Sequence, residues 1–225
     1  MRICALIPAF DEASHIAGVV EGSKRYVQQV VVSDDGSRDG TAEIAEAAGA
    51  ICLRSTSNRG KACALRQAID FAAARDFTHV LTLDGDGQHC PEDIPALIEA
   101  ARATGADLVI GTRTFDRDAM PLARYCSNTF GSKLASALVG QEIRDSQCGF
   151  RLLRLDKLRS IALRSRFYEF EMEVLIKMAR AGGSIAHAPV RTVYDNGQAR
   201  SKMKPVRDTV RICLWSLAFR YLDHV

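Results

Sequence analysis

The 225-residue sequence has no long apolar run and no paired cysteine motif. No stretch of 18 apolar residues occurs, which predicts that no segment spans a membrane. The apolar N-terminal segment is too short for a signal peptide and is interrupted at Pro8. The seven cysteines are odd in number and form no C-x-x-C pair, which favours reduced thiols. We therefore expect a cytoplasmic protein.

The sequence also has no glycine-rich phosphate loop. Gly60-Lys61 lacks the upstream glycine of a P-loop, and the first apolar segment leads into Pro8 rather than into G-x-G-x-x-G. The nucleophile elbow of serine hydrolases is missing, and the histidines are isolated. A net charge of only +3 argues against a nucleic-acid-binding protein. A bound nucleotide must therefore be held by carboxylates, basic side chains and a metal ion.

Apolar runs and amphipathic segments alternate over residues 3–113, which predicts an α/β fold with a mostly parallel, doubly wound sheet and helices on both faces. The expected strands are residues 3–7, 27–33, 50–54, 79–83 and 107–110, and the expected helices 11–23, 41–48, 61–74 and 92–103. Beyond residue 113 we expect helices at 121–139, 170–181 and 205–222, and strands at 150–154 and within 184–194. No repeat or clear linker divides the chain, so we predict a single domain.

Two carboxylates one residue apart follow the fourth expected strand. Gly85 and Gly87 allow the backbone to turn while Asp84 and Asp86 point to one place. This arrangement suits Mg²⁺ or Mn²⁺, which keeps open positions for substrate phosphates. The alternative is ordinary turn chemistry, although an EF-hand loop is excluded by the residues that follow. His89 is either a further metal ligand or a solvated loop residue.

Other polar residues are expected at the same sheet edge, because ligands bind outside the carboxyl ends of parallel strands. Asp34 and Asp35 suit a base edge or ribose hydroxyls, with local turn hydrogen bonding as the alternative. Arg113 suits a diphosphate, with an ordinary surface position as the alternative. For Lys61 the same two roles, a diphosphate contact and an exposed position, fit equally well. Asp145 is either a general base, a positioning carboxylate or a capping residue.

Five motifs in this order resemble those of family 2 glycosyltransferases, in particular the dolichyl- and polyprenyl-phosphate sugar synthases. They are residues 7–12 (IPAFDE), 34–41 (DDGSRDGT), 58–61 (NRGK), 83–89 (LDGDGQH) and 111–113 (GTR). Residues 145–150 and Ser201-Lys202 resemble further segments of these enzymes. Phe10 stands where many relatives have Tyr or Asn, and Asn196 stands where mannosyltransferase relatives have Arg.

The resemblance implies a GT-A type fold and inverting transfer of a hexose from a nucleotide sugar, of the GDP-mannose or UDP-glucose type, to a polyprenyl or dolichyl phosphate. It implies that residues 1–113 bind the donor, that 114–204 form the acceptor side and that 205–225 form a C-terminal helix. The nucleoside pocket would be formed by Pro8, Phe10, Glu12 and Asp35. Asp84, Asp86 and Gln88 would surround the metal and the diphosphate, and Arg113 and Lys202 would contact phosphates.

Two alternatives to this activity stay open. In the first, the acceptor is a soluble molecule or a polysaccharide. In the second, the chain is a non-catalytic subunit that binds the nucleotide sugar. If the acceptor is a lipid phosphate, it is already an anionic nucleophile, and Asp145 has a positioning role. The C-terminal helix carries an apolar stripe with flanking arginines, which fits either a membrane interface at the inner face or packing on the domain's own sheet.

Overall fold

The computed structural model describes residues 1–113, 122–193 and 205–221 of the chain. Within them, seven strands form one sheet in the order β3-β2-β1-β4-β6-β5-β7. The strands are β1 (Ile3–Ala9), β2 (Gln29–Asp34), β3 (Ile51–Arg54), β4 (His79–Thr82), β5 (Leu108–Arg113), β6 (Arg151–Arg154) and β7 (Ile185–Val190). The helices are α1 (Ile16–Lys24), α2 (Thr41–Ala47), α3 (Lys61–Ala73), η1 (Pro91–Asp93), α4 (Ile94–Thr104), α5 (Leu122–Val139), α6 (Leu155–Arg159), α7 (Phe170–Arg180) and α8 (Pro205–Tyr221).

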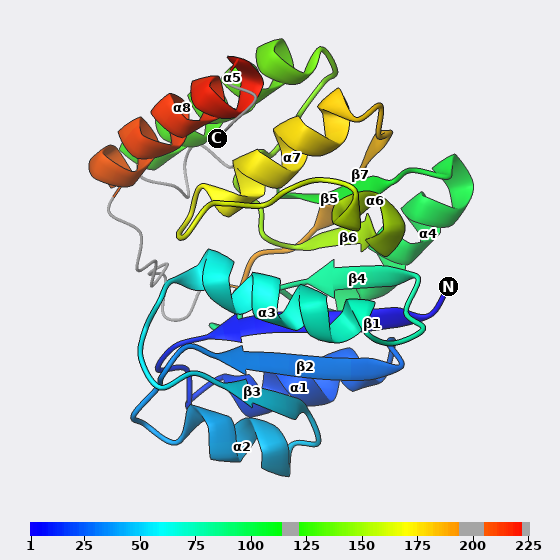
Figure 1. Ribbon diagram of the computed structural model, residues 1–225, viewed down its shortest axis with the longest axis vertical. Helices are drawn as coiled ribbons and strands as arrows, with labels where there is room; N and C mark the ends of the chain where they lie inside the picture. The colour runs from blue at the N-terminus through cyan, green and yellow to red at the C-terminus, as the bar shows by residue number, and fades with distance from the viewer. Residues whose placement is uncertain (114–121, 194–204, 222–225) are drawn as a thin grey trace.

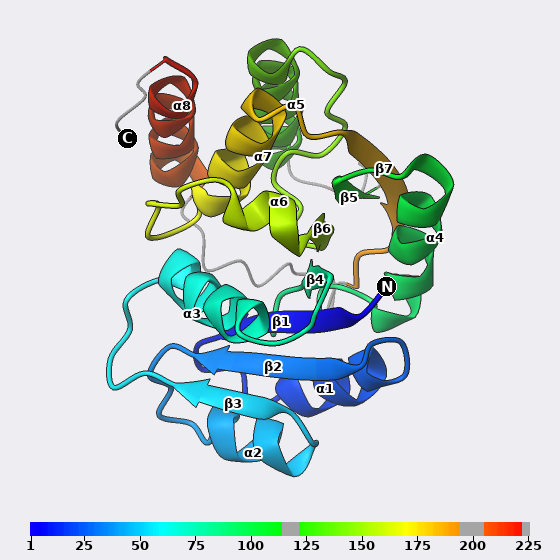
Figure 2. The same cartoon turned by 45° about the vertical axis from the view of Figure 1, so that its right-hand side comes forward.

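The apolar runs form the core of this sheet, as the sequence predicts. In β1, the side chains from Cys4 to Ile7 are fully buried, because helices cover both faces of the sheet. Figures 1 and 2 show α3 on one face of the β1–β2–β3 part and α1 with α2 on the other. This arrangement confirms the expected α/β class and the mostly parallel sheet.

The order of the strands reverses between β1 and β4. From β1 the chain runs outward through β2 to β3, and it then returns to place β4 on the other side of β1. The register aligns Ala9 with Asp34 and Leu6 with Thr82, so three loops leave the sheet at the same edge. Such a reversal is where α/β sheets bind their ligands.

The second half of the sheet is not a continuation of the first. Strand β6 is antiparallel to both of its neighbours, β4 and β5, and β7 is parallel to β5. A strand at residues 150–154 is expected from the sequence, but its insertion between β4 and β5 is not. The short helix α6 is not expected either.

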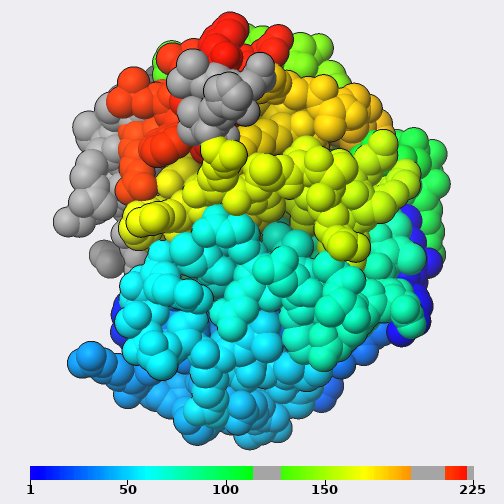
Figure 3. All heavy atoms as spheres, viewed as in Figure 1, coloured from blue at the N-terminus to red at the C-terminus, as the bar shows by residue number. Residues whose placement is uncertain are grey.

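Helix α8 packs on α5 and α7 rather than on the sheet (Figures 1 and 2). Phe219 is fully buried there and stacks on Trp215, with ring centroids 5.6 Å apart. Arg211 forms an ion pair of 3.1 Å with Glu169, just before α7. In the space-filling view the cyan surface of α3 meets the yellow segment that leads into α7, so the two halves of the chain are in contact (Figure 3).

Candidate functional site

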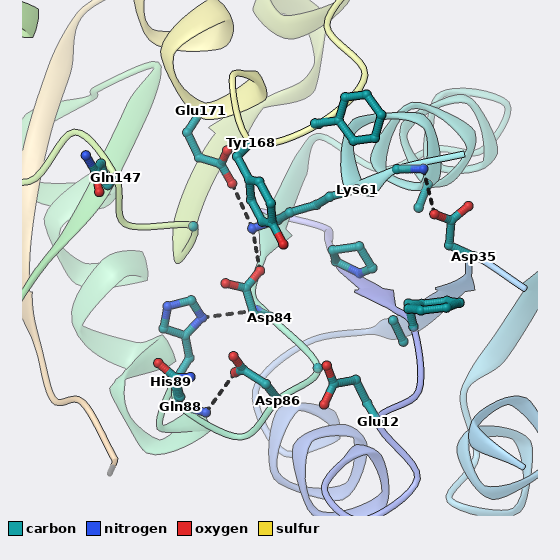
Figure 4. A pocket seen from close by; sticks show the side chains of 18 of the residues that line it. Glu12, Asp35, Lys61, Asp84, Asp86, Gln88, His89, Gln147, Tyr168 and Glu171 are labelled. Carbon is teal, nitrogen blue, oxygen red and sulfur yellow. Dashed lines mark hydrogen bonds and ion pairs between the residues drawn. The ribbon is translucent and has the colours of Figure 1, made fainter. Parts of the chain in front are cut away.

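Hydrogen bonds hold the turn after β4 that carries Asp84 and Asp86, here called the acidic turn. The backbone N–H of Gln88 donates to Asp86 Oδ1 at 3.0 Å, and the N–H of Asp84 donates to His89 Nδ1 at 3.1 Å. The buried His89 ring stacks on Phe150 at 5.2 Å between centroids. Figure 4 shows the side chains of Asp84 and Asp86 open to the same cavity. The structure therefore brings these two carboxylates together, as the sequence predicts.

A cavity of about 270 Å³ lies at this sheet edge. Eight of the predicted site residues line it: Pro8, Phe10, Glu12, Asp35, Asp84, Asp86, Gln88 and Arg113. The second half of the chain closes it with Asn128, Ser146, Gln147, Gly149, Phe167, Tyr168, Glu171, Met172 and Ile212. Residues scattered through the sequence thus meet in one place at the β1/β4 reversal. Lys202 lies outside the described residues.

Asp34 and Asp35 have different positions despite being neighbours. Asp34 is not among the residues that line the cavity, and its carboxylate accepts hydrogen bonds from the N–H and hydroxyl of Ser37. For Asp34 the alternative of local turn bonding is therefore what the structure has. Asp35 lines the cavity, and its two oxygens accept the backbone N–H groups of Arg59 and Gly60 at 2.9 and 2.7 Å. Asp35 thus fixes the loop that leads into α3.

Asp145 is buried and bound to Arg113 in this structure. It is fully buried and does not line the cavity. Arg113 donates to it from Nε at 2.7 Å and from Nη2 at 3.0 Å, a two-pronged charge-assisted pair. A carboxylate held in this way is poorly placed to accept a substrate proton. We therefore interpret Asp145 as the residue that orients Arg113 toward the cavity, which favours the second of the roles expected for it.

Lys61 lies inside the site, between two carboxylates. Its Nζ is 2.6 Å from Asp84 Oδ1 and 2.8 Å from Glu171 Oε1 (Figure 4). The sequence left the role of Lys61 open and gave no indication of Glu171. Acidic residues are common in the first turn of a helix, where the helix dipole favours them, so Glu171 had no distinguishing signal.

The charges at the acidic turn are unequal. Burial favours the neutral form of Asp84, but the Lys61 ammonium outweighs it and lowers the pKa of Asp84 to about 2. Burial and the neighbouring Asp84 carboxylate raise the pKa of Asp86 to about 6. Burial lowers the pKa of His89 to about 4, so its ring is neutral and its Nδ1 accepts the hydrogen bond from Asp84. Asp86 therefore holds a proton more readily than Asp84, chiefly because it is buried and also because it lies beside the Asp84 carboxylate.

The two carboxylates fit a divalent cation that arrives with a diphosphate. Within the part of the chain that the structure describes, no three His, Cys, Asp or Glu side chains come close enough to form a complete metal cage. Mg²⁺ typically takes one or two carboxylates and completes its shell with water and substrate phosphates. The mutual repulsion of Asp84 and Asp86 in one cavity is what such a cation would relieve. His89 is not suited to be a further ligand through Nδ1, which already accepts a hydrogen bond.

Three residues of the apolar stripe that the sequence predicts on α8 are exposed, and the residue of α8 that lines the cavity, Ile212, is not part of that stripe. Ile212 is buried and lines the cavity, whereas Leu214, Leu217 and Tyr221 are 64, 44 and 70% exposed. The helix therefore presents apolar side chains both to the domain and to its outside. In the described ranges, no helix combines the length and the apolar character needed to cross a bilayer.

Comparisons with known proteins find similar sequences over most of the chain. The profile of the family described as "Glycosyl transferase family 2" matches residues 4–162. An uncharacterised protein of Methanocaldococcus jannaschii is 33% identical over 203 residues, which is 84% of this chain and 87% of that protein. The undecaprenyl-phosphate mannosyltransferase of Micrococcus luteus is 30% identical over 237 residues, covering 98% of this chain and 96% of the relative.

A solved structure has the same fold. Glucosyl-3-phosphoglycerate synthase from Mycobacterium tuberculosis, crystallised with Mn²⁺ and UDP-glucose, superimposes with a TM-score of 0.73 at 22% identity. The match covers 97% of this chain and 78% of that protein. This likeness confirms the fold expected from the sequence.

Proposed function

The chain belongs to glycosyl transferase family 2, and from this premise we propose that it transfers a hexose from a nucleoside-diphosphate sugar to a polyprenyl phosphate. Its fold is of the GT-A type, and it is a glycosyltransferase. The named relative that matches almost the whole chain is an undecaprenyl-phosphate mannosyltransferase, which supports the lipid acceptor. The neighbour crystallised with UDP-glucose and Mn²⁺ supports a nucleotide-sugar donor and a divalent metal.

One observation carries the proposal. The cavity joins the acidic turn to Phe10, Glu12 and Asp35 on the side of the first half, and to Tyr168 and Ile212 on the side of the second half. A donor whose diphosphate lies at the acidic turn would place its nucleoside against the first group. Its sugar would then face the second half, from which the acceptor approaches.

The residues have distinct roles in this mechanism. Asp84 and Asp86, with Gln88 beside them, would hold Mg²⁺ or Mn²⁺, which supplies positive charge to the leaving diphosphate. Arg113, held by Asp145, contributes a second positive charge from the wall of the cavity. An oxygen of the lipid phosphate attacks the anomeric carbon, and the bond from that carbon to the diphosphate breaks. The nucleoside diphosphate leaves with the bonding electrons, and the configuration inverts.

A phosphate acceptor explains why the site needs no strong base. The attacking oxygen already carries a negative charge, so no proton has to be removed from it. This agrees with an Asp145 carboxylate that is occupied by Arg113 rather than open to substrate.

We also propose that the outward face of α8 rests on the lipid surface at the cytoplasmic side of the membrane. The exposed Leu214, Leu217 and Tyr221 lie on one stripe of the helix, and Trp215 is exposed beside them. Arg220 adjoins this stripe, with its guanidinium carbon 5.7 Å from the ring centroid of Tyr221, and its positive charge suits an anionic bilayer. The opposite face of the same helix carries Ile212 into the cavity, so membrane contact would place the cavity near the acceptor.

The test of the activity is product formation by the purified protein. UDP-glucose or GDP-mannose is supplied with Mn²⁺ and detergent-dispersed polyprenyl phosphate, and a glycosyl polyprenyl phosphate should form. Transfer only to soluble acceptors would overturn the lipid acceptor. Tight donor binding without turnover on any acceptor would indicate a non-catalytic subunit.

The membrane contact has a separate test. We expect the wild-type protein to co-sediment with vesicles that contain anionic lipid, and the Leu214→Ser, Leu217→Ser double variant to bind them at least tenfold more weakly. Ala137→Ser, an exposed change on α5, is the control and should bind like the wild type. Equal binding by all three proteins would remove α8 from the interface.

A further inference from the structure

The ammonium of Lys61 occupies the carboxylate that the proposed metal needs. It lies 2.6 Å from Asp84 Oδ1, and its other partner, Glu171 Oε1, lies 2.8 Å away on α7. The side chains of Lys61, Asp84 and Glu171 are only 19, 31 and 8% exposed, so water screens these pairs weakly. Lys61 thus connects the acidic turn of the first half of the chain to a glutamate of the second half (Figure 4).

The surrounding backbone holds Lys61 in this position. Gly60 has a φ of +98°, and a Cβ there would overlap the carbonyl oxygen of Arg166. The same glycine donates its N–H to Asp35, which fixes the start of α3. A Cβ on Gly149 would lie 3.1 Å from Lys61 Nζ and 3.2 Å from Asp84 Oδ2. The ion pair is therefore enclosed on several sides.

Glu171 is anchored independently of Lys61. Its backbone carbonyl accepts a hydrogen bond from Nη1 of the buried Arg151 at 2.6 Å. The backbone from which the Glu171 carboxylate extends is therefore held without any contribution from Lys61. The ammonium has one partner that stays and one that a ligand can compete for.

A divalent cation at Asp84 must compete with this ammonium, because both are positive and both bind the same carboxylate. A diphosphate changes the competition in two ways. It brings oxygen ligands for the cation, and it offers the ammonium new acceptors in place of Asp84.

We propose, on the basis of the proposed donor and metal site, that Lys61 is the internal counter-ion of Asp84 in the empty site. When the donor binds, the Lys61 ammonium moves from Asp84 to the diphosphate. Metal and nucleotide therefore bind strongly only together. Glu171 retains the ammonium during the exchange. Such a device couples the two ligands thermodynamically, and each raises the affinity of the other by the same factor. It keeps the empty site from holding a metal without substrate.

The affinity for Mn²⁺ alone tests the competition. In Lys61→Met the competitor is gone, so Mn²⁺ without nucleotide should bind about tenfold more tightly, or about 1.4 kcal/mol. The factor by which UDP or GDP raises the Mn²⁺ affinity should fall by a similar amount. In Glu171→Gln the ammonium has only Asp84 as a charged partner, and Mn²⁺ alone should bind about threefold more weakly.

A double variant separates this competition from a simple effect of net charge. Lys61→Met combined with Glu171→Gln leaves the net charge of the site unchanged. The proposal predicts that Mn²⁺ alone still binds more tightly to it than to the wild type, whereas net charge alone predicts no change. Lys177→Met is the matched control, because Lys177 forms a 2.7 Å pair with Glu173 on the same helix but does not line the cavity.

Calorimetric titration of the intact proteins with Mn²⁺, with and without UDP or GDP, provides the measurement. Melting temperatures identify any variant that does not fold. If Lys61→Met does not fold, Glu171→Gln provides the test, because glutamine preserves the shape of the glutamate side chain. If wild type shows nucleotide-dependent Mn²⁺ binding and the Lys61 and Glu171 variants bind Mn²⁺ as it does, the counter-ion role is overturned. If the wild type binds no Mn²⁺ with either nucleotide, the proposed metal site itself is overturned.

Discussion

Four carboxylates at or beside the cavity are held by different means in the two halves of the chain. In the first half, the carboxylates of Asp35 and Asp86 accept backbone N–H groups from loops at the sheet edge. In the second half, Asp145 and Glu171 are bound to cationic side chains that come from the first half, Arg113 and Lys61. Backbone donors cannot move away from their partners without a change of fold, whereas a long cationic side chain can change partners.

This difference suggests a division of labour within one site. The first half presents a preformed surface for the nucleotide and its diphosphate. The second half sets the position of the cations that meet the diphosphate. Substitutions in the two halves should therefore differ in how they divide their effects between stability and activity.

The largest effect on activity is expected at the acidic turn. Asp86→Asn keeps an acceptor for the N–H of Gln88 but removes the charge that the metal needs, so kcat/KM should fall by about 10³-fold or more while the melting temperature changes little. Asp76→Asn removes a 91% exposed carboxylate of the same half and should leave the kinetics unchanged. Near-normal transfer by Asp86→Asn would contradict the metal site.

A mixed effect is expected in the second half. Asp145→Asn leaves the guanidinium of Arg113 without its buried charged partner, which should cost about 3 kcal/mol of stability, roughly 6–12 °C in Tm. Because Arg113 also loses its orientation, kcat/KM should fall by about 10²-fold. Thermal unfolding and steady-state kinetics measure the two effects.

A carboxylate of the same strand system provides the control for Asp145. Asp107 is buried and pairs with Arg154 at 3.1 Å, but it does not line the cavity. Asp107→Asn should lower the melting temperature without changing kcat/KM at a temperature where the protein is folded. Equal losses of activity in Asp107→Asn and Asp145→Asn would show that Asp145 acts only through stability.

The smallest effect is expected at Asp35. An asparagine side chain has one acceptor oxygen for the two N–H groups of Arg59 and Gly60, so unfolding should become easier by about 1–2 kcal/mol. The loop that it fixes lies beside the proposed nucleoside, so KM for the donor should rise about tenfold with little change in kcat. A fall in kcat at unchanged KM would move Asp35 from nucleoside binding to the chemical step.

Much of the fold and of the site can be predicted from local patterns. The buried strands β1, β2 and β4 are continuous apolar runs, and the acidic turn follows the last of them directly. The helices at 122–139, 170–180 and 205–221 agree with the expected ranges. Asp34 shows the limit of this reasoning. It precedes Asp35 directly and is also an aspartate, but its carboxylate accepts a hydrogen bond from Ser37 and does not line the cavity.

The sequence by itself determined the strand and helix periodicities, the two carboxylates after β4 and the family to which their motifs point. These features depend on residues that are close together in the chain, so apolar runs, helical periodicity and short motifs are enough to predict them. The tertiary structure alone decided that β6 enters the sheet antiparallel between β4 and β5, that Asp145 holds Arg113, and that Glu171 meets Lys61. Those contacts join distant segments, and they arise from how the helices and strands pack rather than from any pattern along the chain.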